Sequence, residues 1–130
     1  MLVNYPIQHL VTFDENNNAT VELTCQTPFL KSEIEEISLN LILDISDLNQ
    51  PFPLSPNISI NQVNKKAKIK FVLTDFNILQ LAPEQFQIYD LTNMSMFQIS
   101  LNHKSEKQII NLPVYCYLDQ NSIKFEIFDP

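Results

Sequence analysis

The stretch that decides the fold is Ile37-Ser38-Leu39-Asn40-Leu41-Ile42-Leu43-Asp44-Ile45. Its odd-numbered positions are all apolar, and its even-numbered positions are polar apart from Ile42. Side chains of a β-strand alternate between two faces, so this period of two predicts a strand with one buried and one mostly solvated face. Such a strand is typical of an antiparallel sheet that packs on one side only.

The same alternation recurs along most of the chain. It predicts further strands at residues 7–13, 19–27, 58–63, 67–73, 86–91, 94–101, 107–118 and 122–128. Polar turns separate them, and two neighbouring pairs read as hairpins, 7–27 and 58–73. We therefore predict one all-β domain over residues 1–130, an antiparallel β-sandwich of seven to nine strands, immunoglobulin-like or jelly-roll-like. A barrel is the alternative. One short helix is predicted near residues 75–81, ending before Pro83.

The composition lacks both glycine and arginine, and the net charge is −7. Without glycine, we expect asparagine and aspartate to occupy the turn positions that need a positive φ. Without arginine, the chain cannot form bidentate contacts to phosphate or guanine. The basic residues 65–70 include Lys68 and Lys70, which alternate with Ile69 and Phe71 and are predicted to form the solvated face of a strand. We expect no nucleic-acid partner.

No segment approaches the roughly 20 consecutive apolar residues of a membrane span. The first residues, from Met1 to Pro6, contain neither a basic stretch nor a long apolar run, so no signal peptide is expected. We predict no membrane partner.

The nucleophile and base candidates sit in strand or turn patterns. Cys25 and Cys116 lie within apolar alternation, which favours buried free thiols over the alternative of a disulfide. His9 shares a strand face with apolar residues and is expected in the core or at its rim, and His103 is expected in a solvated turn. Phosphate-binding and hydrolase motifs are also missing from the sequence. We therefore expect no enzyme and no cofactor.

Two pairs of acidic residues could supply oxygen ligands to calcium, namely Asp44 with Asp47 and Asp14 with Glu15. In a glycine-free chain such residues are also the expected turn formers, and this reading is favoured. A β-sandwich module that binds a glycan or calcium remains the alternative function.

Residues 47–56 contain three prolines, at positions 51, 53 and 56, which exclude a central strand. Phe52 and Leu54 in this loop either rest on the core or contact a partner, and we take them as the candidate partner-binding residues. A proline-stiffened loop loses little entropy on docking.

Residues 68–79 read KIKFVLTDFNIL and are followed by Leu81, Pro83 and the apolar strand 86–88. Together with the strand and loop before them, residues 37–101 resemble N-terminal modules of phage baseplate upper proteins. The resemblance implies an immunoglobulin-like sandwich that anchors or links subunits in a virion, with no catalytic residue carried over. We therefore expect a non-enzymatic structural or adaptor protein of a phage virion (baseplate, tail or head accessory), present in the host cytoplasm before assembly. Its expected partners are other structural proteins of the assembly, with a homo-oligomer as a further possibility.

Overall fold

The computed structural model describes residues 4–16, 18–42, 52–77, 94–119 and 122–127, and of the side chains within these ranges all but those of residues 94, 116–119, 122 and 123. Several predictions from the sequence fall outside this part of the chain. They are the strand at 86–91, the end of the strand at 43–45, most of the helix at 75–81, and the candidate calcium ligands Asp44 and Asp47.

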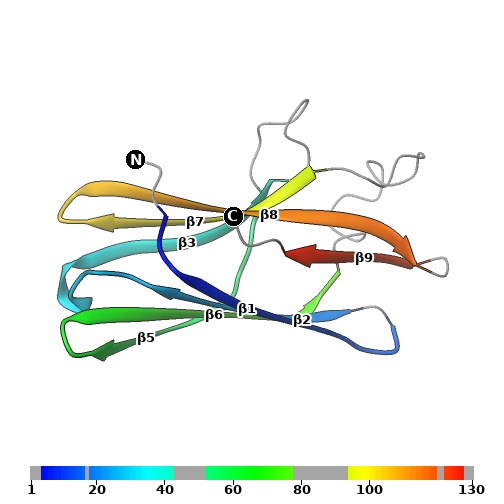
Figure 1. Cartoon of the computed structure of the whole chain (residues 1–130), viewed down its shortest axis with the longest axis horizontal. Helices are drawn as coiled ribbons and strands as arrows, with labels where there is room; N and C mark the ends of the chain where they lie inside the picture. Colours follow the sequence, from blue (N-terminus) through cyan, green and yellow to red (C-terminus); the bar gives the residue numbers. More distant parts are fainter. Residues whose placement is uncertain (1–3, 17, 43–51, 78–93, 120–121, 128–130) are drawn as a thin grey trace.

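Nine strands form two antiparallel sheets in the described residues. The four-stranded sheet has the order β1-β2-β6-β5, with β1 (Ile7–Phe13), β2 (Ala19–Gln26), β5 (Asn57–Val63) and β6 (Lys66–Phe76). The five-stranded sheet has the order β4-β3-β7-β8-β9, with β3 (Ile34–Ile42), β4 (Phe52–Pro53), β7 (Met94–His103), β8 (Glu106–Asp119) and β9 (Ser122–Ile127). Figure 1 shows the two sheets as stacked layers. The predicted β-sandwich is confirmed.

The strand order identifies the type of sandwich. Immunoglobulin domains place their first, second, fifth and fourth principal strands in one sheet and the third, sixth and seventh in the other. Here β1-β2-β6-β5 corresponds to the first set, and β3-β7-β8 to the second, with β4 added beside β3 and β9 beside β8. Among the described strands, the order therefore matches that of an immunoglobulin-type sandwich, with β9 as an additional C-terminal strand.

β8 changes its neighbour along its length. Residues 106–115 pair with β7, whereas residues 114–119 pair with β9. Residues 4–6 lie beside the five-stranded layer, and the chain then crosses to the other layer as β1 (Figure 1). The first half of β8 therefore pairs with β7 along one edge. Residues 4–7 lie near its other edge.

The core lies between the two sheets and follows the predicted alternation. Its fully buried large side chains come from β2, β3, β6, β7 and β8: Val21, Leu23, Leu39, Leu41, Ile69, Phe71, Phe97, Ile99, Leu101 and Leu112. Four phenylalanine rings from both layers form an aromatic cluster. The centroid of the Phe125 ring lies 5.4 Å from that of Phe13, 5.4 Å from that of Phe76 and 6.2 Å from that of Phe97. Three aromatic residues at alternating strand positions, Phe71, Phe97 and Phe125, are buried in this core.

The start of the predicted helix at 75–81 is wrong, because β6 continues through Phe76. Phe76 is buried in the aromatic cluster and pairs with Ala19 of β2 across a bulge. This tertiary contact outweighs the local helix signal. A short 3-10 turn, η1 (Lys31–Glu33), is the one helical element among the described residues, and no helix there could span a membrane.

The prediction for positive-φ positions is only partly right. Asn64 fits it, with a φ of 60° in the turn between β5 and β6. Asp75 has a φ of 54° but lies at the bulge of β6, and Glu36, Lys104 and Ser105 also have positive φ. Lys104 and Ser105 form the two-residue turn between β7 and β8, where the strand twist favours positive φ at both positions. Glu36 lies in the bulge where β3 shifts register against β7.

Candidate functional site

His103 is not the solvated turn residue that the sequence predicts. It ends β7, and its ring stacks on Phe29 with centroids 3.6 Å apart and planes 8° apart. Its Nε2 lies 3.9 Å from Glu33 Oε2. The same carboxylate oxygen forms an ion pair with Lys104 Nζ at 2.9 Å. The hydrogen bond from Lys104 lowers the pKa of the Glu33 carboxyl, since it favours the charged form. This cluster fixes η1 to the β7–β8 turn and contains no nucleophile.

The remaining nucleophile and base candidates are structural. Cys25 is free and fully buried on β2, and burial raises the pKa of its thiol to about 12. The free-thiol prediction is confirmed for Cys25, whereas the side chain of Cys116 lies outside the described part. His9 is half-buried on β1, in agreement with a position at the rim of the core.

The carboxylate of Asp14 is used in its own turn. Its Oδ1 accepts hydrogen bonds from the backbone N–H of Asn16 at 2.8 Å and of Asn18 at 3.0 Å. In the described ranges no group of three or more His, Cys, Asp or Glu side chains could hold a metal ion. Asp14 is therefore explained as a turn former.

Lys66, Lys68 and Lys70 are exposed and alternate with buried Ala67 and Ile69 on β6. Lys70 Nζ also lies 3.6 Å from Glu22 Oε1 on the neighbouring strand. The prediction that Lys68 and Lys70 form the solvated face of a strand is confirmed.

Phe52 and Leu54 are less accessible than the sequence suggests. Phe52 pairs with Leu41 in the short edge strand β4, and Leu54 N–H donates to the Leu39 carbonyl at 3.0 Å. Both side chains are half-buried and pack against the core. Of the two alternatives for these side chains, the structure shows contact with the core, because backbone pairing with β3 holds the loop against the domain. Their contact with a partner stays a prediction.

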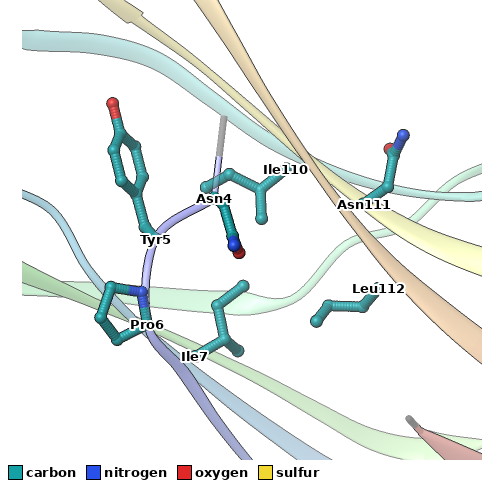
Figure 2. A pocket seen from close by; sticks show the side chains of 7 residues that line it. All are labelled: Asn4, Tyr5, Pro6, Ile7, Ile110, Asn111 and Leu112. Atoms are coloured by element: carbon teal, nitrogen blue, oxygen red, sulfur yellow. The ribbon is translucent and has the colours of Figure 1, made fainter. Parts of the chain in front are cut away.

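A small cavity of about 190 Å³ separates the N-terminal segment from β8. Figure 2 shows Asn4, Pro6 and Ile7 on one side of it and Leu112 on the other. Tyr5 anchors this segment, since its hydroxyl donates to Gln108 Oε1 at 3.5 Å. Pockets for small organic ligands usually exceed about 300 Å³, so this cavity is a packing gap at the entry to β1.

The broadest feature is the outer surface of the five-stranded sheet. The register of β3, β7 and β8 places uncharged side chains in successive cross-strand rows, which we name the neutral face: Ser38, Asn40, Ile42, Met96, Gln98, Ser100, Ile109, Asn111, Pro113 and Tyr115. Each alternates with a core residue, and Gln98 Nε2 donates to Asn111 Oδ1 at 3.2 Å across the middle row. Charged side chains flank it, with Lys107 at one end and Glu126 on β9.

The outer surface of the four-stranded sheet differs in charge. It carries Glu22, Lys68 and Lys70 in its centre. The composition, with a net charge of −7, does not indicate a neutral surface. This surface is recognised only from the register that aligns β3, β7 and β8.

Comparison with known proteins gives no relative: no protein-family model, no curated protein and no solved structure matches this chain significantly.

Proposed function

We propose that this chain is a non-enzymatic structural or adaptor subunit of a multi-subunit assembly and acts through contacts with other proteins. The neutral face is the observation that carries the proposal. Centres of protein interfaces are depleted of charged residues, whereas freely solvated surfaces are not. An uncharged surface over three central strands of an acidic protein is therefore best explained as a contact surface.

The size of the neutral face supports an interface centre. Three strands about 4.8 Å apart, with about five to seven residues of each in this face at ~3.4 Å per residue, cover roughly 300 Å² in projection. A standard interface buries about 800 Å² per partner, so the flanking strands and their charged residues would form the rim. Pro53 on β4 lies opposite Asn40 and extends the uncharged surface at one edge, whereas Phe52 lies opposite buried Leu41 and points toward the core side.

The assembly that we propose is a phage virion. Support comes from the resemblance of residues 37–101 to N-terminal modules of baseplate upper proteins, and the immunoglobulin-like strand order agrees with the fold that this resemblance implies. In this role the domain would link subunits, with other virion structural proteins as its partners.

The test inserts charge into the neutral face. Asn40→Lys with Asn111→Lys adds two charges to it, and Gln8→Lys with Thr12→Lys adds two to the outer surface of β1 as a matched control. Each tagged chain is expressed in the source cells during particle production, and particles are separated on a density gradient. We expect wild type and control to sediment with particles and the neutral-face variant to stay with free protein, at an unchanged melting temperature. Absence of the wild type from particles, or equal incorporation of all three, would contradict the proposal.

A further inference from the structure

β5 (Asn57–Val63) is an exposed edge strand with an unusual sequence. It pairs with β6 on one side, and no other described strand pairs with it. Its seven residues, NISINQV, include no charge, no proline and no glycine. Six of them are exposed, and two of the four large apolar side chains exposed in the described ranges, Ile58 at 40% and Val63 at 48%, belong to it.

Natural proteins protect edge strands, because unpaired backbone N–H and C=O groups accept further strands. The other edges here carry such protection. β4 has only two residues, one of them Pro53. β9 contains Lys124 and Glu126. The edge of β1 lies beside β9, with Lys124 Nζ 5.6 Å from the centre of the Phe13 ring.

The free edge of β8 before its pairing with β9 is also covered. The N-terminal segment runs along it, and Pro113 interrupts its row of donors. Within the described residues, β5 has none of these devices. It combines three β-branched residues with zero charge and no proline, features that favour strand-to-strand pairing.

We propose that two copies of this chain pair through β5, antiparallel about a twofold axis at Ser59, and so join two four-stranded sheets into one continuous sheet. A second copy is the partner because the strand complements itself in this register. Ile58 lies opposite Ile60 of the other copy, Asn57 lies opposite Asn61, and Ser59 meets its own counterpart.

The faces of β5 agree with this register. Ile58 and Ile60 are cross-strand neighbours of buried Phe71 and Ile69, so both point toward the core side of the sheet. The pairs Ile58–Ile60 would therefore extend the cores of the two copies toward each other. The outward residues Asn57, Ser59 and Asn61 would form polar pairs on the other face.

Charge also favours a second copy at this edge. Two acidic chains of charge −7 repel each other, and contact is least costly where neither carries a charged side chain. The edge continues into the other sheet, since β4 leads through residues 54–56 directly into β5 (Figure 1). The half-buried Phe52 and Leu54 thus lie at the same side of the sandwich. This dimer needs no other protein, so it can fail while the proposed assembly role stands, and the reverse also holds.

Cysteine cross-linking of the purified full chain tests both contact and register. Antiparallel neighbours have Cα atoms about 4.5–5.5 Å apart, within the range that a disulfide spans. We expect Ser59→Cys to form a covalent dimer under mild oxidation. Asn57→Cys alone should not, because its counterpart lies about four residues away, roughly 13 Å. A mixture of Asn57→Cys and Asn61→Cys chains should cross-link through the Asn57–Asn61 pair.

Wild type serves as the control for the native cysteines. If Asn57→Cys alone cross-links as fast as Ser59→Cys, or if Ser59→Cys stays monomeric, the proposed register is wrong.

Sedimentation measures the association without a cross-link. Ser59→Lys places two like charges opposite each other on the twofold axis at an exposed position, and Gln8→Lys adds the same charge at the far edge. We expect the wild type and Gln8→Lys to dimerise with increasing concentration and Ser59→Lys to associate at least about tenfold more weakly. A wild type that remains monomeric at about 1 mM would overturn the proposal.

Discussion

Replacing Phe125 by leucine tests whether the aromatic cluster joins β9 to the sandwich. Phe125 is 2% exposed and makes three ring contacts, to Phe13, Phe76 and Phe97. Phe71 is equally buried at 0% but takes part in none of the ring pairs of the described residues. Phe71→Leu is therefore a control with the same chemical change in the same core.

The two variants differ in their expected cost. The smaller side chain and the void it leaves should lower the free energy of unfolding by roughly 1–2 kcal/mol at either position. Each aromatic pair adds about 0.5–1.5 kcal/mol beyond its buried area. The three pairs share one ring, so their energies should not add in full. We expect Phe125→Leu to lower the free energy of unfolding by ~1.5–3 kcal/mol more than Phe71→Leu does.

Urea unfolding followed by circular dichroism measures this difference. With a slope of about 1–3 kcal/mol per molar urea, the midpoint of Phe125→Leu should lie roughly 1 M below that of Phe71→Leu at an unchanged slope. Equal midpoints for the two variants would refute the role of the ring contacts. A changed slope would instead indicate loss of two-state unfolding, and then β9 would separate from the rest before the sandwich unfolds.

Three further predictions concern single side chains. Cys25, measured in a Cys116→Ser variant, should resist maleimide in native buffer and react in urea, because at pH 8 a thiol of pKa about 12 is ionised about a thousand times less often than one of pKa 9.0; complete native labelling at the urea rate would contradict its burial. Ser105→Gly should raise the free energy of unfolding by about 0.5–1 kcal/mol, since glycine adopts the φ of 69° without Cβ strain, and a lower melting temperature would contradict this. Lys104→Met should raise the pKa of the Glu33 carboxyl toward its ordinary value in an NMR titration. Because this pKa is lowered by folding, the stabilisation from Glu33 is present above the ordinary carboxyl pKa and is lost as the pH falls through the lowered value, and an unchanged titration in Lys104→Met would reject the pair.

The strands and the core were predictable because alternation is a local property of the chain. The spacing of Leu39 and Leu41, or of Ile69 and Phe71, requires no knowledge of distant residues, and all four are buried as expected. The division into two sheets was not predictable in the same way. It depends on which strands pair, and alternation alone leaves immunoglobulin-like and jelly-roll-like orders equally open.

Turn conformations were less predictable, because the twist of the flanking strands selects φ and the sequence only accommodates it. Lys104 and Glu36 adopt positive φ although residue preference favours asparagine or aspartate. Each also makes a contact from that position, Lys104 with Glu33 and Glu36 Oε2 with Asn102 Nδ2 at 2.7 Å. These contacts help to offset the backbone strain.

The candidate site was the least predictable part. His103 stacks on a residue 74 positions earlier in the chain, and Phe52 and Leu54 rest on β3 through backbone pairing. The neutral face and the unprotected edge of β5 also arise from pairing between distant strands. The sequence of a single strand gives only its own side chains. The pairing register decides which side chains of other strands lie beside them.

The change of neighbour along β8 has a consequence for local opening of the domain. Residues 106–115 pair with β7 inside the sandwich, but among the described strands only β9 pairs with residues 116–119. A two-stranded ribbon is marginally stable without further neighbours. We therefore expect amide protons near the C-terminal end of β8 to exchange with solvent through fraying of this ribbon, while those amides of residues 106–115 that donate to β7 exchange only when the whole domain opens.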